Sequence, residues 1–125
     1  MSWQRALLGS GHVDLATIVG FEDQAIWASS KGFVPSADEI KEIISGLKQT
    51  NLDKLRVDGL YIAGERYVLT KSEDRTLIVR KGKEGVVIVK SKKAILIAHY
   101  NESMLATNCS FIVEGLADYL EKQGY

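Results

Sequence analysis

LRVDGLYIAGERYVLTKSEDRTLIVRKGKEGVVIVKSKKAILIAHY, residues 55–100, decides the fold class of this chain. The stretch contains runs of strand length, rich in β-branched and aromatic residues, at 55–64, 66–71, 76–81, 85–91 and 94–100. The gaps between these runs are short and carry turn residues. Because parallel strands need long crossovers, the short gaps predict an antiparallel meander of about five strands.

The residues before this stretch predict a hairpin and a helix. HVDLATIVG (12–20) and AIWASS (25–30) have strand length, and a short turn separates them. In PSADEIKEIISGLK (35–48), Ser36 and Glu39 stand at the spacing of a capping box, and apolar residues follow at helical intervals. We therefore expect two further strands and a helix, with a polar connection at 49–53 before the meander.

Both ends of the chain predict helices. Residues 2–8 have the length of two helical turns, with Ser2 as the N-cap. In CSFIVEGLADYLEKQGY (109–125), an apolar stripe wide enough to pack on a sheet recurs at helical spacing: Cys109, Ile112, Val113, Leu116 and Leu120. The whole pattern predicts one α+β domain over residues 1–125, with helices covering the faces of a single antiparallel sheet.

Composition narrows the classes of function. The chain has 125 residues with sixteen basic and sixteen acidic side chains, so no net field attracts nucleic acid. The one cysteine, Cys109, forms no internal disulfide and suits a reducing compartment. We find no signal segment and no apolar run near the roughly 18 residues of a membrane span, so we expect a cytoplasmic protein. His12 and His99 stand in no nucleophile or metal-binding pattern, so we expect neither an enzyme nor a cofactor.

Several motifs then resemble one family along the whole chain. MSWQ, IWASS, EDRTL, KGKEGVVIVKSKKAILIAHYNE and IVEGLADYLEKQGY are similar to profilins of the short, lower-eukaryotic type. The resemblance implies a central antiparallel sheet meander with the N- and C-terminal helices on one face and a further helix on the other. It also implies an actin-binding protein of the cytoskeleton, and we take a monomer as the default.

The resemblance implies a groove for proline-rich segments. The matching positions are Trp3, Trp27, Tyr119 and Tyr125. A polyproline II segment is stiff before it binds, so aromatic walls hold its rings at little entropic cost, while tyrosine hydroxyls and the indole N–H donate to its carbonyls. The alternative for Trp27 is a packing role beneath the groove. SWQRALLGSG reaches its glycines about four residues sooner than the family pattern, so we expect a helix about one turn shorter, no second groove aromatic and a weaker groove.

A second surface is implied for monomeric actin, on the later strands and the start of the last helix. The matching residues are Arg75, Arg80, Lys81, Lys90, Tyr100 and Asn101. Arginine suits fork-like contacts to acidic groups and lysine suits looser steering, although each charge alone also fits a solvated strand end. EDRTLIV and SMLATNCS depart from the usual family pattern. They place Ile78, Val79, Met104 and Leu105 where the interface would differ.

The resemblance also implies binding of phosphatidylinositol bisphosphate. Positive charges on neighbouring turns could meet its anionic head group: Lys81, Lys83, Lys90, Lys92 and Lys93. The alternative is that these lysines keep hairpin tips soluble and unpaired.

Two functional hypotheses follow, and a third stays open. The first is an adaptor that sequesters actin monomers and delivers them to filament ends through proline-rich partners such as formins. The second is a proline-rich peptide recognition module with weak or lost actin binding. The third, a small-molecule sensor, is disfavoured because the sequence has no glycine-rich or polar pocket signature. Peptide titration separates the third hypothesis from the others, and actin binding separates the first two.

Overall fold

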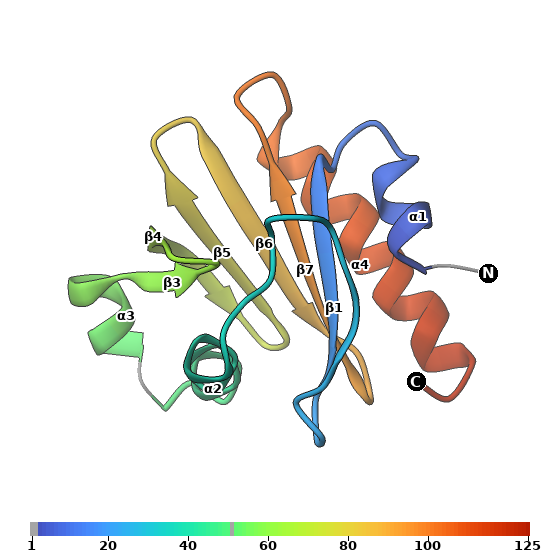
Figure 1. The fold of residues 1–125 in the computed structure, drawn as a ribbon, viewed down its shortest axis with the longest axis horizontal. Coiled ribbons are helices and arrows are strands. Elements are labelled where there is room, and N and C mark those ends of the chain that lie inside the picture. The colour runs from blue at the N-terminus through green and yellow to red at the C-terminus, as the bar shows by residue number, and fades with distance from the viewer. Residues whose placement is uncertain (1–2, 51) are drawn as a thin grey trace.

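The computed structural model describes residues 3–50 and 52–125 and follows the predicted order of elements closely (Figure 1). The helices are α1 (Trp3–Leu8), α2 (Ala37–Leu47), α3 (Leu52–Asp58) and α4 (Ala106–Lys122). The strands are β1 (Leu15–Gly20), β2 (Ile26–Ser29), β3 (Leu60–Ile62), β4 (Glu65–Glu73), β5 (Thr76–Lys81), β6 (Glu84–Lys90) and β7 (Ala94–Tyr100). The predicted N-cap Ser2 lies outside the described residues.

The strands form one antiparallel sheet in the order β2-β1-β7-β6-β5-β4-β3. Strands β3 to β7 are neighbours in sequence and in space, which confirms the predicted meander. The hairpin of β1 and β2 is also confirmed, and β1 joins the meander by pairing with β7 from Leu15↔His99 to Gly20↔Ala94. The first and last strands in sequence, β1 and β7, therefore lie next to each other inside the sheet.

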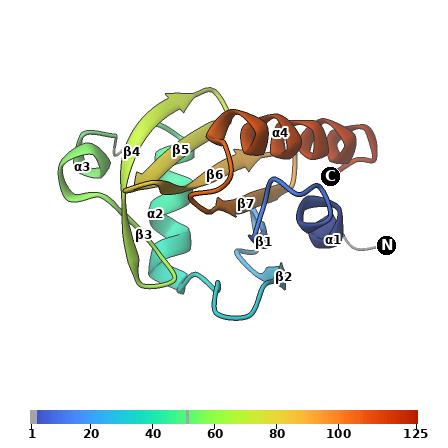
Figure 2. The ribbon, with the colours of Figure 1, turned by 90° about the horizontal axis from the view of Figure 1, so that it is seen from above.

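Helices cover both faces of the sheet (Figure 2). Alternate residues of β7 face opposite layers because side chains of a strand alternate in direction. Leu96 and Ala98 pack with buried residues of α1 and α4. Ile95 and Ile97 pack with buried residues of α2 and α3. The predicted placement of the N- and C-terminal helices on one face, with further helix on the other, is confirmed.

The predicted capping box of α2 forms and also holds a neighbouring turn. Ser36 N donates to Glu39 Oε1 at 2.8 Å, and Glu39 N donates to Ser36 Oγ at 3.2 Å. The same carboxylate accepts from Ala63 N at 2.9 Å and Gly64 N at 3.0 Å. Both turn residues have positive φ, as a tight hairpin requires, so Glu39 ties α2 to the turn between β3 and β4.

The first predicted strand of the meander, 55–64, is wrong over its first half. Residues Leu52–Asp58 form α3, and only Leu60–Ile62 is strand. Leu55 is fully buried, whereas Val57 is exposed, so the alternation that suggested a strand does not describe the burial. Gly59 has φ +86°, and its N–H donates to Leu55 O at 3.0 Å, which ends the helix. The connection predicted at 49–53 is correspondingly shorter.

Candidate functional site

Three aromatic rings from distant parts of the chain meet at one surface. Trp3 on α1, Trp27 on β2 and Tyr125 after α4 have ring centroids 5.0 to 6.4 Å apart. We call these three residues the ring cluster. Trp27 and Tyr125 are 40% and 42% exposed, so the rings pack on one another yet leave surface open to a ligand. A contiguous exposed apolar surface of this kind suits contact with an apolar partner.

Hydrogen bonds hold both end segments against the sheet. Gln4 Nε2 donates to the Ala16 carbonyl of β1 at 3.1 Å. Ser91 Oγ donates to the Tyr125 carbonyl at 2.8 Å, and the backbone N–H of Lys93 donates to the same oxygen. The backbone that carries the ring cluster is therefore anchored at α1 and again after α4.

Trp27 lies over β1 at a glycine. A Cβ on Gly20 would stand 2.9 Å from Trp27 Nε1 and 2.0 Å from Asp23 Oδ1, so a side chain there would collide with both groups. Glycine at this position lets the indole approach the strand closely while its outer side stays open. Gly20 is thus a positioning residue for the ring cluster, and the sequence alone did not suggest it.

The fourth predicted groove residue, Tyr119, stands apart from the ring cluster. It lies on α4 and is half-exposed, but it makes none of the ring contacts found among the described residues of this surface. Helix α1 has six residues, in keeping with the predicted short opening helix. The structure therefore concentrates the aromatic surface in three rings and places Tyr119 as an exposed neighbour on α4.

Arg75, the first residue predicted to contact actin, is bound within the molecule. It lies in the turn between β4 and β5, and its guanidinium donates to Asp118 Oδ1 at 2.6 Å and to Glu121. Its Nε lies 3.4 Å from Glu114 Oε1. Burial lowers the pKa of Arg75, but the hydrogen bond to Asp118 and the charges of the three carboxylates outweigh it and raise that pKa. Arg75 thus ties the sheet to α4.

The other basic residues predicted at this surface lie in different surroundings. Arg80 is exposed on β5 and donates to Gly82 O at 3.2 Å. Lys81 is paired with Glu65 of β4. Lys90 is the last residue of β6, at the end of that strand away from Arg80 and Lys81, and its Nζ lies 4.3 Å from the centroid of the Phe21 ring. The structure therefore does not bring these three cations into one patch.

Tyr100 and Asn101 have structural surroundings at the end of β7. Tyr100 is only 3% exposed and packs in the layer of α1 and α4. A Cβ on Gly85 would stand 2.3 Å from its hydroxyl, which explains the glycine opposite it. Asn101 Oδ1 accepts from Ser103 N at 3.0 Å and so orders the loop that leads to α4. Their contact with actin remains a prediction, and for Tyr100 it would require the ring to leave a packed site.

An exposed apolar surface lies at the start of α4, where the resemblance implied contact with actin, and it includes Phe111, to which the sequence analysis gave no role. Phe111 is 79% exposed and lines a hollow of about 500 Å³ together with Ile78 of β5. Leu105, at the N-cap position of α4, is also exposed. The available signal was the position of Phe111 well away from the apolar stripe of its helix, because an aromatic residue on a solvent face has no role in the core.

The five lysines predicted to bind phosphoinositide are divided between the two ends of the sheet. Lys81 and Lys83 adjoin the turn between β5 and β6, whereas Lys90, Lys92 and Lys93 lie at the turn between β6 and β7. The seven residues of β6 separate these turns by about 20 Å. The turns are neighbours along the chain but not in space, because consecutive antiparallel turns lie at opposite ends of a strand.

The titratable groups in the interior are committed to packing or pairing. His99 Nδ1 lies 2.6 Å from Asp14 Oδ1, and Nε2 lies 3.3 Å from Glu84 Oε1. Burial raises the pKa of the Cys109 thiol to about 12, which leaves it protonated at neutral pH. Within residues 3–50 and 52–125, no group of three acidic, histidine or cysteine side chains is placed to hold a metal ion. No helix in these ranges is long and apolar enough to cross a membrane.

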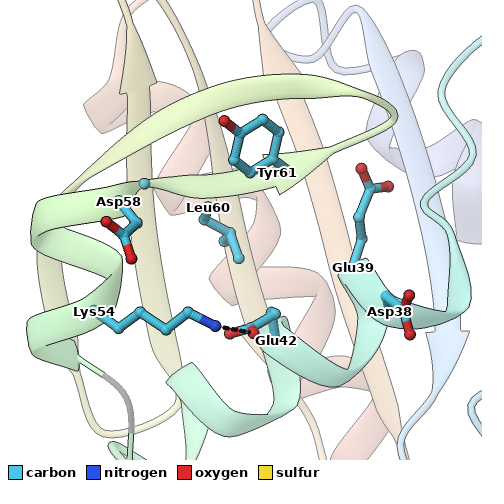
Figure 3. A pocket seen from close by; sticks show the side chains of 8 residues that line it. Asp38, Glu39, Glu42, Lys54, Asp58, Leu60 and Tyr61 are labelled. Carbon is cyan, nitrogen blue, oxygen red and sulfur yellow. Dashed lines mark hydrogen bonds and ion pairs between the residues drawn. The ribbon is translucent and has the colours of Figure 1, made fainter.

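A small pocket lies between α2, α3 and β3, on the sheet face opposite α1 and α4 (Figure 3). Its volume is about 260 Å³, below the range usual for small-molecule sites. Lys54 Nζ lies 2.6 Å from Glu42 Oε1 across the pocket. Glu39 is engaged by the backbone groups described above. The internal pairing of these groups gives the small-molecule sensor no specific support.

The fold and the ring cluster define a class of small α+β protein with an exposed aromatic surface where the two end segments of the chain meet. The family model for profilin matches residues 1–125. Profilin of Saccharomyces cerevisiae is 41% identical over 123 residues, covering 96% of each chain. The chain belongs to the profilin family.

Solved structures agree with this assignment. The crystal structure of Schizosaccharomyces pombe profilin matches with a TM-score of 0.89 and 36% identity, over 99% of this chain and all of that one. Mouse profilin IIa, solved with a double repeat from the FH1 domain of mDia1, matches with a TM-score of 0.85 over the full length of both chains. Its identity is 19%, so that likeness concerns the fold.

Proposed function

We propose that this profilin is an adaptor that binds actin monomers on one surface and proline-rich segments on another, and so delivers actin to filament ends. We also propose that it acts as a cytoplasmic monomer without enzymatic activity. The observation that carries the proposal is the ring cluster, whose three ring centroids lie within 6.4 Å of one another and whose Trp27 and Tyr125 rings remain exposed to solvent. The mouse profilin bound to an FH1 repeat supports a formin as the kind of proline-rich partner.

The ring cluster suits a polyproline II helix in scale and chemistry. Such a helix rises about 3.1 Å per residue, so ring separations of 5.0 to 6.4 Å correspond to about two residues. Proline rings pack against the aromatic faces, and the Trp3 and Trp27 N–H groups and the Tyr125 hydroxyl are potential donors to the free carbonyls of the ligand. Tyr119 extends this surface along α4 in the proposed complex.

We place the actin-binding surface over the start of α4 and the adjoining strands. An exposed aromatic residue beside a hollow suits the apolar centre of a protein interface, and Phe111 and Ile78 supply it. Arg80 supplies an exposed cation near this centre, whereas Lys81, paired with Glu65, and Lys90, over the Phe21 ring, lie away from it. Arg75, Tyr100 and Asn101 shape the surface through the contacts described above.

Polymerisation of pyrene-labelled actin tests both surfaces together. We expect the protein to slow spontaneous assembly, and a formin fragment with its proline-rich region to restore it. Trp3→Ala should keep the slowing but lose the restoration. Phe111→Ser should lose the slowing and still bind polyproline. Val57→Ser, which changes another exposed apolar residue, on α3, serves as the matched control. Unchanged assembly together with polyproline binding would favour a peptide recognition module without useful actin affinity.

A second proposed function is binding of phosphatidylinositol bisphosphate at one end of the sheet. Lys90 and Lys48 both lie over the Phe21 ring, at 4.3 and 5.8 Å from its centroid. Lys92 and Lys93 lie in the adjoining turn, so four cations gather at this end. Replacing Lys90, Lys92 and Lys93 by Gln should reduce binding to vesicles that contain this lipid, whereas Lys83→Gln at the opposite end should not. Equal loss in both variants would argue against this placement.

A further inference from the structure

A hollow of about 220 Å³ adjoins the ring cluster at Trp27. Glu22, Asp23 and Lys93 line it together with the indole. Glu22 and Asp23 belong to the turn between β1 and β2, and Lys93 comes from the turn between β6 and β7. The hollow therefore continues the aromatic surface but carries two carboxylates and one ammonium group. A ligand that extends past the rings meets a different chemistry there.

The turn holds Asp23 beside the indole. Asp23 Oδ1 accepts from Ala25 N at 3.0 Å, and Gly20 N donates to Ala25 O at 2.8 Å. The Asp23 carboxylate and Trp27 Nε1 both lie within 2.9 Å of the place where a Gly20 Cβ would stand, so they are adjacent to each other. The carboxylate is fixed at one edge of an exposed aromatic ring instead of moving freely in solvent.

We infer that Glu22 and Asp23 make this surface select proline-rich segments that carry an arginine or lysine next to the prolines. The inference rests on the proposed binding of such segments to the ring cluster. A guanidinium group can stack on the open part of Trp27 and donate hydrogen bonds to both carboxylates at its edge. The hollow has a net negative charge with Lys93 included, so an acidic residue at the same place is repelled.

The size of the ring cluster makes such a flanking contact important. Three rings within 6.4 Å of one another span about two residues of a polyproline II helix. A ligand a few residues longer than this must leave the rings, and on the side of Trp27 it enters the hollow. The basic residue then adds affinity that the aromatic surface by itself does not supply.

Titration of the full chain with synthetic peptides tests the inference, with tryptophan fluorescence as the readout. The peptides are a proline decamer flanked by Arg at either end in turn, and the same decamer flanked by Gln or by Glu. We expect one Arg peptide to bind about fivefold more tightly than the Gln peptide, as for a partly exposed ion pair. The Glu peptide should bind more weakly than both, and the preference should shrink in high salt.

Two charge-matched variants separate the hollow from the overall charge of the protein. Glu22→Gln with Asp23→Asn should bring the affinities of the Arg and Gln peptides to within about twofold of each other, without weakening the binding of the Gln peptide. Asp53→Asn with Glu102→Gln removes two exposed acids elsewhere and should keep the preference. Equal binding of all peptides to the unmodified chain would overturn this inference but not the proposed groove. A preference for the Arg peptide that survives Glu22→Gln with Asp23→Asn would do the same. If none of the peptides binds, the proposed groove itself is wrong and the inference falls with it.

Discussion

Replacing Arg75 by methionine is the sharpest test of how the sheet is fastened to α4. The guanidinium is 27% exposed and pairs with Glu114, Asp118 and Glu121, which lie on one face of the helix. A charge-assisted hydrogen bond such as that to Asp118 is worth about 1 to 2 kcal/mol, and partly exposed pairs add a few tenths each. Without Arg75 the three carboxylates also repel one another at helical spacing. We expect Arg75→Met to lower the free energy of unfolding by about 2 kcal/mol.

Urea unfolding, followed by circular dichroism, measures this loss. A decrease of this size should lower the melting temperature by roughly 8 °C in a domain of this length. The deficit should shrink in 1 M NaCl, because the paired charges of the unmodified chain are then screened. Arg56→Met is the control, since Arg56 Nη1 lies 3.6 Å from Oδ1 of a fully exposed Asp53 and this pair should contribute little to stability.

A loss below about 0.5 kcal/mol would refute the view of Arg75 as an internal tie, because surface substitutions commonly change stability by that much. The same variant bears on the proposed actin surface. If Arg75→Met weakens actin binding while the free energy of unfolding stays unchanged, Arg75 is a direct contact residue and its pairing with α4 is incidental. A loss of stability with unchanged actin affinity would assign it to the scaffold.

Three further predictions concern the aromatic surface, the interior and the start of α4. Gly20→Ala should displace the Trp27 indole and weaken polyproline binding about tenfold in a fluorescence titration, and unchanged affinity would contradict the role given to Gly20. Burial raises the pKa of Cys109 from 9.0, and that of Tyr67 from 10.0, to about 12 in each case, so above pH 9 the unfolded chain releases protons that the folded chain keeps. The contribution of these two groups to stability should therefore be level below pH 9 and then fall by about 1.4 kcal/mol per pH unit and per group up to pH 12, from pH 9 for Cys109 and from pH 10 for Tyr67. Urea unfolding of Cys109→Ala should show a shallower fall. Phe111→Ser should reduce actin affinity at least about fivefold while changing the free energy of unfolding by no more than about 0.5 kcal/mol, and an unfolded variant or unchanged affinity would count against an interface role.

Local patterns in the sequence predicted most of the fold. The strands from β4 to β7 were recognisable because alternation and short turns are properties of a few neighbouring residues. The same holds for α2, where Ser36 and Glu39 lie within one helical turn. The error at α3 has the opposite cause. The seven residues of α3 fit both the strand period and the helix period. Only the packing of Leu55 into the core, together with Gly59 at the end of the helix, decides between the two.

The site was predictable as a set of residue types but not as an arrangement. The terminal position of Trp3 suggested a partner for its ring, yet the contact with Trp27 and Tyr125 depends on β1 pairing with β7 and on the docking of α1 beside α4. The internal partners of Arg75 are 39 to 46 residues away in the sequence, at Glu114 to Glu121. No local pattern encodes such distances, so a positive charge at a strand end looks the same whether it meets solvent, actin or its own helix.

The sequence by itself determined the class of fold, the helix and strand periods, and the aromatic residues at both ends of the chain. The tertiary structure decided which of these residues meet. It brought the Trp3 and Tyr125 rings into contact and buried Tyr100 in the layer of α4. It also placed the lysines predicted to bind phosphoinositide at the two ends of β6. The physical reason is that periodicity specifies only which way a side chain points. Its partner is set by the order of strands in the sheet and by the helices that cover each face.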